Sequence, residues 1–200
     1  MKRTFALLGF TALAGFILIA VVSTQSAKPP VFQGSLIDPP ILAKDFLLHD
    51  QNGQPFRLSD QHGKVVLLYF GYTYCPDVCP ATLVDFKRIR EGLGDRVNEV
   101  EFVFITVDPD RDTTDQMKNY LGGFAPNFIG LRDEPPVLQQ VWADYGIAPQ
   151  KQPGAGTAGY LVDHPARVYV IDRSGNLRLT FPFGLAAEAM LHDVLVLFAD

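Results

Sequence analysis

A continuous run of apolar and β-branched residues at 64–70 constrains the fold of this chain most strongly. A strand with one solvated face alternates apolar and polar residues, whereas a strand buried on both faces is apolar throughout. The run therefore predicts a strand in the interior of a parallel or mixed sheet. The following segment, 81–93, has Leu83, Phe86 and Ile89 at helical spacing and predicts a helix that packs on this sheet.

The chain continues to alternate in this way from residue 45 onward. Residues 46–58 predict a β-hairpin, because Asn52-Gly53 between two apolar runs suits a tight turn. Further strands are expected at 100–107, 127–131, 167–172 and 177–181, and helices at 113–121 (capped by Thr113 or Thr114), 136–145 and 185–198. This order predicts the α/β class and a thioredoxin-like fold, a mixed sheet flanked by helices with an N-terminal β-hairpin. Residues 148–159 are rich in Gly and Pro and predict an irregular loop.

The first 27 residues differ from the rest and predict a single transmembrane helix. Lys2 and Arg3 precede an apolar run from Phe5 to Val22, which is long enough to span a bilayer. The basic start favours a cytoplasmic N-terminus, so the rest of the chain is expected outside the cytoplasm. A cleaved signal peptide is the alternative, because small residues follow the run, although its apolar stretch is longer than signal peptides usually have.

Residues 28–44 predict a tether, and residues 45–200 the folded domain. The tether contains two proline pairs, which favour extended backbone. From residue 31 onward the chain carries 14 basic and 22 acidic residues. No basic patch stands out in this acidic domain, which argues against nucleic acid as a partner.

The chain has two cysteines, Cys75 and Cys79, in the sequence Cys-Pro-Asp-Val-Cys-Pro between the predicted strand and helix. Pro80 suits the first position of that helix, where a missing N–H costs nothing. Both sulfurs would then lie at or before the helix N-terminus, where free N–H groups favour the thiolate form.

Three interpretations of this pair are open from the residues alone. A structural disulfide across so short a loop would contribute only about 2 kcal/mol. A dithiol redox site is the second interpretation, although thioredoxin-like oxidoreductases use two intervening residues at this junction and this chain has three. The third is a metal site, because two thiolates suit Cu(I) and leave room for an imidazole ligand.

His164 is the candidate for this third ligand. It lies in Asp163-His164-Pro165, just before the strand expected at 167–172, in a loop that faces the cysteine turn in a thioredoxin-like fold. Asp163 is either a partner of the free ring nitrogen or a turn residue. Pro165 favours extended backbone at His164 and permits a cis peptide bond. The other three histidines lie in polar stretches or on the last helix and are expected on the surface: His49, His62 and His192.

Four segments together resemble the Sco (SenC) family. They are Gly71-Tyr72-Thr73-Tyr74-Cys75-Pro76-Asp77-Val78-Cys79-Pro80, Ile105-Thr106-Val107-Asp108-Pro109-Asp110-Arg111-Asp112-Thr113, Phe128-Ile129-Gly130-Leu131 and Val162-Asp163-His164. The resemblance runs from about residue 42 to the end, and the N-terminal anchor is typical of the family. It departs at Pro165, where many relatives have a small hydroxyl residue.

The resemblance implies a copper chaperone of the bacterial inner membrane with its domain in the periplasm. Cys75, Cys79 and His164 match the family's copper ligands, for Cu(I), Cu(II) or both, whereas Asp108, Pro109 and Arg111 are expected to be structural. The implied target is the binuclear copper A centre of cytochrome c oxidase subunit II. Further expected partners are the membrane and a periplasmic copper carrier or thiol reductase. An alternative function is a thiol–disulfide oxidoreductase in which Cys75 and Cys79 keep the target's cysteines reduced.

Overall fold

The structure is a computed structural model of the chain and describes residues 31–153 and 159–199. The predicted anchor at 1–27 lies outside these residues. Within the described ranges, no helix combines the length and the apolar character that crossing a membrane requires. From Phe32 onward the chain forms one structural unit.

The centre of the fold is a set of three parallel strands, β4 (Val65–Gly71), β5 (Val100–Thr106) and β6 (Ile129–Arg132). Every residue of β4 is buried, as the continuous apolar run predicted. Because β4 and β5 are covered on both faces, their side chains supply much of the core on each side of the sheet.

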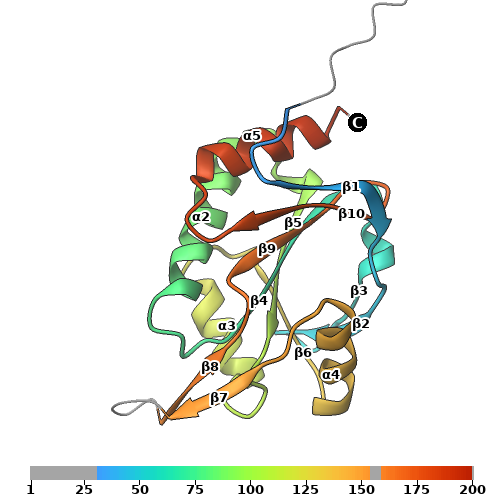
Figure 1. Cartoon of the computed structure of the whole chain (residues 1–200). Coiled ribbons are helices and arrows are strands. Elements are labelled where there is room, and N and C mark those ends of the chain that lie inside the picture. Colours follow the sequence, from blue (N-terminus) through green and yellow to red (C-terminus); the bar gives the residue numbers. More distant parts are fainter. Residues whose placement is uncertain (1–30, 154–158, 200) are drawn as a thin grey trace, which may run out of the picture. The chain divides into compact units, whose positions relative to one another are not determined.

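Antiparallel strands extend this centre at both edges into an eight-stranded mixed sheet. Beyond β4 lie β9 (Arg167–Ile171), β10 (Asn176–Pro182) and β1 (Ser35–Leu42). Beyond β6 lies the predicted N-terminal hairpin, β2 (Leu47–Asp50) and β3 (Pro55–Arg57). The mixed sheet and its order confirm the thioredoxin-like arrangement (Figure 1).

Helices cover both faces of the sheet (Figure 1). On one face lie α2 (Val78–Leu93), α3 (Thr114–Gly122) and α5 (Ala187–Leu197); on the other lies α4 (Pro135–Asp144). Ring contacts from α2 and α3 reach β5, whereas Tyr145 at the end of α4 packs on Phe70 from the opposite side. Thr113 caps α3, as predicted, by accepting a hydrogen bond from the Gln116 N–H. Two short 3-10 helices, Leu58–Gln61 and Gly94–Glu99, complete the fold.

The boundary of the predicted tether needs a correction. Within the range 28–44, Ser35–Leu42 forms β1 and pairs with β10 at the edge of the sheet. Its register shifts between Leu36 and Ile41, where the Pro39-Pro40 pair lies. An edge strand with a bulge tolerates prolines, because it needs no N–H donors on its open side. The prolines that suggested a tether therefore lie in the irregular part of an edge strand.

The loop predicted at 148–159 also needs a correction. Gln150–Pro153 forms β7, which pairs with β8 (Tyr160–Asp163) as a separate two-stranded hairpin. The sequence did not predict β7 because all four of its residues are exposed, so it has no apolar alternation. This hairpin projects away from the main sheet (Figure 1) and leads directly into His164.

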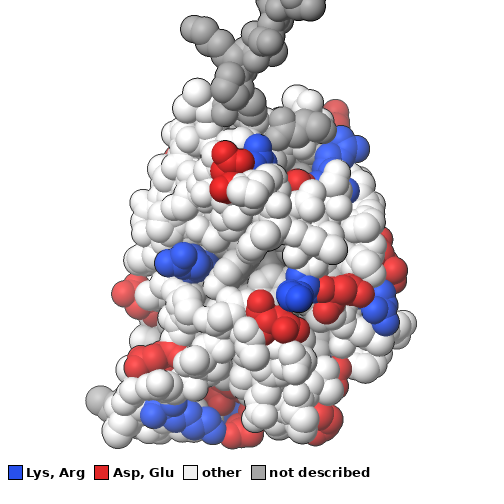
Figure 2. Space-filling model, turned by 45° about the vertical axis from the view of Figure 1, so that its right-hand side comes forward, with Lys and Arg blue, Asp and Glu red and all other residues white. Residues whose placement is uncertain are grey.

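The charged side chains on the face drawn in Figure 2 form small groups of mixed sign. Basic groups on this face lie beside acidic ones or stand alone, and they do not merge into a broad basic area. Phosphate backbones are bound by extended sets of Lys and Arg. The face shown carries no such extended set.

Candidate metal centre

The two cysteines lie where β4 passes into α2, as predicted. Cys75 lies in the turn, and Cys79 is the second residue of α2. The helix begins at Val78, two residues before Pro80, so Pro80 occupies its third position rather than its first. Pro80 is tolerated there because the N–H groups of the first turn have no partner within the helix.

The two sulfurs differ in exposure. Cys79 is fully buried, Cys75 is half-buried, and both are free thiols. Gly71 makes room for the inner sulfur, because a Cβ at this position would lie 2.9 Å from Cys79 Sγ. The buried Tyr69 hydroxyl donates a hydrogen bond to the same sulfur at 3.5 Å. Burial raises the pKa of Tyr69, so this donor keeps its proton.

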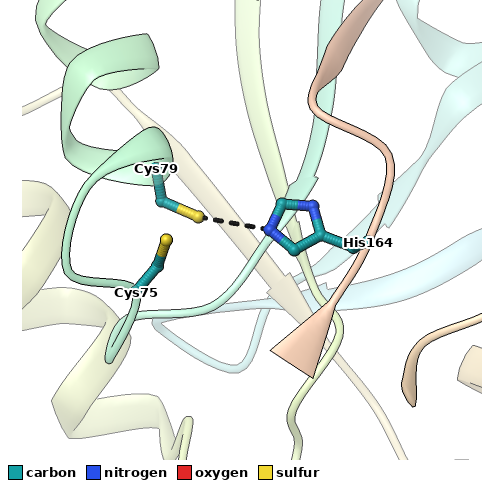
Figure 3. A group of neighbouring side chains, drawn as sticks. All are labelled: Cys75, Cys79 and His164. Atoms are coloured by element: carbon teal, nitrogen blue, oxygen red, sulfur yellow. Dashed lines mark hydrogen bonds between the residues drawn. The ribbon is translucent and has the colours of Figure 1, made fainter. Parts of the chain in front are cut away.

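His164 follows β8 and points toward the two cysteines (Figure 3). Its Nε2 atom lies 3.7 Å from Cys79 Sγ. One ligand atom from each of Cys75, Cys79 and His164 lies within 4.8 Å of the other two. The structure therefore brings together three side chains that are separated by up to 89 positions in the sequence.

The free ring nitrogen of His164 has a backbone partner. Nδ1 lies 3.3 Å from the Pro165 carbonyl oxygen, which accepts a hydrogen bond only if Nδ1 carries the proton. The Nε2 lone pair then faces the sulfurs. Asp163 does not hold the ring; its carboxylate accepts from Gln152 Nε2 at 3.0 Å, across the hairpin. The Pro165 peptide bond is trans, since Asp38–Pro39 is the cis bond of the described residues.

Electrostatics separate the roles of the two thiols. A hydrogen bond from the Cys79 thiol, helped by backbone N–H groups, holds the pKa of Cys75 far below its ordinary value. The same hydrogen bond and burial raise the pKa of Cys79. Cys75 is therefore the thiolate of the metal-free pair, and Cys79 keeps its proton until an acceptor or a cation displaces it.

Two tyrosines that the sequence did not single out enclose the imidazole. The rings of Tyr69 and Tyr72 stand edge-on to the His164 ring, with centroids 6.0 and 5.8 Å away. Tyr72 belongs to the family-like segment at the cysteines, but nothing in the sequence indicated that it would contact a residue 92 positions later. An open cleft of about 400 Å³ lies beside this group, between the cysteine turn and β8.

The remaining histidines lie on the surface, as predicted. His49 pairs with Asp133 at 2.8 Å, and the ring of His192 pairs with Asp193 at 3.0 Å. His62 is exposed beside Gly175. None of them belongs to the cluster of possible ligands in the described part of the chain.

The chain is similar to known proteins along most of its length. The SCO1/SenC family profile matches residues 35–198. This chain belongs to the SCO1/SenC family. An SCO2-like protein of Rickettsia conorii is 34% identical over 187 residues, covering 92% of this chain and 89% of the relative.

Two solved structures of SCO1/SenC relatives show the same fold. The Bradyrhizobium japonicum ScoI structure with copper bound is 35% identical, with a TM-score of 0.71 over 78% of this chain and 98% of that one. Apo Sco1 from Thermus thermophilus is 36% identical, with a TM-score of 0.74 over 86% of this chain and 99% of that one. The family fold is therefore known both with copper and without it.

Proposed function

We propose that this SCO1/SenC protein binds copper through Cys75, Cys79 and His164 and delivers it to the copper A centre of cytochrome c oxidase subunit II. The observation that carries the proposal is the convergence of two sulfurs and one imidazole nitrogen within 4.8 Å. Thiolate ligands favour Cu(I), and imidazole suits copper in either state. A copper-bound relative of the same fold supports the choice of metal.

The asymmetry of the site suits a carrier. Copper binding would displace the Cys79 proton, since thiolates rather than thiols bind metals. Cys79 would hold the ion from the interior side, whereas Cys75 and His164, both half-buried, border the open cleft. Ligands of a partner can reach the ion from this cleft and replace Cys75 or His164 before Cys79. The cargo would then leave without unfolding of the domain.

The proposed location is the bacterial inner membrane, with residues 45–200 in the periplasm. The apolar run at 5–22 and its basic start support a membrane anchor there. A periplasmic copper carrier would supply the ion, and a thiol reductase would keep Cys75 and Cys79 reduced. Copper insertion requires reduced thiols, so the copper carrier and the thiol reductase would both act on Cys75 and Cys79.

Replacing His164 with alanine tests the ligand set. Removal of a group that only hydrogen-bonds to a metal ligand lowers metal affinity roughly 10–100-fold. Removal of a ligand itself should lower Cu(II) affinity by more than this. Cu(I) affinity should fall much less, because both sulfurs remain. Competition titrations with chelators of each ion measure both affinities. His49→Ala, which removes an exposed histidine, should match the parent; equal and negligible losses for both ions in His164→Ala would exclude it as a ligand.

The opposite pKa shifts of the two thiols favour thiol–disulfide exchange as a second function. The Cys75 thiolate would attack one sulfur of a target disulfide and form a mixed disulfide, and the other target sulfur would leave as a thiolate. Cys79 would then lose its proton and attack Cys75 Sγ. The target would leave as a dithiol, and Cys75–Cys79 would form a disulfide, so two electrons pass to the target. This reaction would prepare the target's cysteines for copper.

Trapping of the mixed disulfide tests this second function. The Cys79→Ser chain, mixed with subunit II whose copper A cysteines are oxidised, should accumulate a mixed disulfide through Cys75. Cys75→Ser should accumulate far less, because the Cys79 sulfur is fully buried and out of reach of a target disulfide. Non-reducing electrophoresis and mass spectrometry identify the linked cysteines. The exchange reaction is excluded if the Cys79→Ser chain forms no adduct.

A further inference from the structure

Arg111, in the segment between β5 and α3, contacts the hairpin that carries His164. Its guanidinium lies 3.6 Å from the centroid of the Tyr160 ring, close enough for a cation–π contact. Its Nη1 atom donates a hydrogen bond to the Tyr160 carbonyl oxygen at 2.9 Å. Tyr160 is the first residue of β8, four positions before His164. Arg111 therefore binds both the side chain and the backbone at the start of this strand.

Asp108 makes this contact rigid. Its carboxylate is fully buried and accepts a hydrogen bond from Arg111 Nε at 2.5 Å and one from the Tyr160 hydroxyl at 2.7 Å. Charge-assisted hydrogen bonds in a buried site are strong and costly to break. The three side chains thus form a closed cluster in which each member contacts the other two.

Arg111 also faces the cysteine turn. Its guanidinium lies 4.9 Å from the Tyr74 ring centroid and 5.6 Å from that of Tyr72. Tyr74 precedes Cys75 directly, and the Tyr72 ring stands perpendicular to the His164 ring. A single guanidinium therefore contacts both walls of the metal centre, the cysteine turn and the His164 strand.

The position of β8 depends on such contacts because no strand of the main sheet pairs with it in the described residues. Its backbone partner is β7, in a separate two-stranded sheet. An isolated two-stranded hairpin is only marginally stable in water. The side chains of β8 that pack on the domain therefore decide where His164 lies, and they are chiefly the buried Val162 and the Tyr160 ring under Arg111.

We propose that Arg111 is a positioning residue of the metal centre, which holds β8 against the cysteine turn so that His164 faces the two sulfurs. The inference rests on the proposed copper function and assigns that site a further residue. It does not make Arg111 a ligand. Loss of its contacts would leave the thiolate pair intact and loosen the imidazole, so binding of Cu(II) should suffer and binding of Cu(I) should not.

Two conservative variants test this role in the 200-residue chain. Arg111→Lys keeps the charge beside Asp108 but loses the planar group that both stacks on Tyr160 and bonds its carbonyl. Tyr160→Phe keeps the ring and removes only its hydrogen bond to Asp108. Arg57→Ala is the control, because Arg57 pairs with the exposed Asp45 at the far edge of the sheet. Thermal unfolding of each metal-free variant shows that the fold is kept.

Arg111→Lys should lower Cu(II) affinity about tenfold, which is the lower end of the range for residues that support a metal ligand without binding the metal. Cu(I) affinity should stay at the parent value. Tyr160→Phe should act in the same direction and less, and Arg57→Ala should have no effect. In a His164→Ala background, Arg111→Lys should cause no further loss. Equal losses for Cu(I) and Cu(II), or an undiminished loss in the His164→Ala background, would overturn the proposal.

Hydrogen exchange in the metal-free chain separates this inference from the copper function. Arg111→Lys should speed exchange of the backbone amides of 160–164, whereas those of β4 should exchange as in the parent. Unchanged exchange at 160–164 would overturn the positioning role even if copper binds. Faster exchange in a chain that binds no copper would support the positioning role and overturn only the copper function.

Discussion

The Cys79→Ser variant is expected to bind Cu(I) more weakly by at least about two orders of magnitude. This loss is larger than the one caused by removing a group that only hydrogen-bonds to a metal ligand. Cys79 Sγ lies at the centre of the site: Nε2 of His164 lies 3.7 Å from it, and the Tyr69 hydroxyl donates to it. A serine oxygen is a hard donor and a poor ligand for Cu(I). One sulfur and one imidazole would remain, and they would hold the ion weakly.

The size of this loss distinguishes a thiolate pair from a site with a single essential sulfur. Cys75→Ser should cause a loss of similar size, because each sulfur supplies half of the soft donor pair. Competition with a Cu(I) chelator measures both variants, and the melting temperatures of the metal-free chains show whether the fold survives. A Cys79→Ser chain that keeps the parent's Cu(I) affinity would show that the inner sulfur is not a ligand.

Asp112→Ala is expected to lower the free energy of unfolding by about 3–5 kcal/mol, because it leaves several buried hydrogen-bond donors without an acceptor. The Asp112 carboxylate is fully buried. It accepts from the Thr73 N–H at 3.1 Å and from the hydroxyls of Thr73 and Thr106, each at 2.6 Å. These bonds join the start of the cysteine turn to the end of β5.

Asp110→Ala is the matched control for Asp112→Ala. Asp110 lies two positions away, is 63% exposed and pairs with Lys151 on the surface. Exposed ion pairs contribute about 0–1 kcal/mol, so its loss should change stability little. Urea unfolding monitored by circular dichroism compares the two variants. A change below about 1 kcal/mol in Asp112→Ala, equal to that of an exposed pair, would contradict the role given to its buried hydrogen bonds.

The elements that the sequence predicted well are those whose residues face the core. The apolar run in β4 and the helical spacing of apolar residues in α2 both result from burial against the core. These residue patterns were therefore sufficient to predict the two elements. The patterns failed at β1 and β7, where exposed residues pair at an edge or in a separate hairpin. Backbone pairing of an exposed strand leaves no apolar alternation in the sequence.

The metal centre was predictable to different degrees at its three positions. Cys75 and Cys79 stand four apart between a strand and a helix, so local chemistry was enough to mark them. His164 depended on the family resemblance, because its distance to the sulfurs is set by how β8 packs. The contacts of Arg111 with Tyr160 could not be predicted, because they join segments that no local pattern relates.

X-ray absorption at the copper edge of the loaded, reduced chain tests the central claim most directly. We expect two sulfur donors and an imidazole nitrogen around one copper ion, with the imidazole signal lost in His164→Ala. We also expect a single sulfur donor in Cys75→Ser and in Cys79→Ser. A spectrum without sulfur donors, or an imidazole signal that persists in His164→Ala, would contradict the assignment of the site.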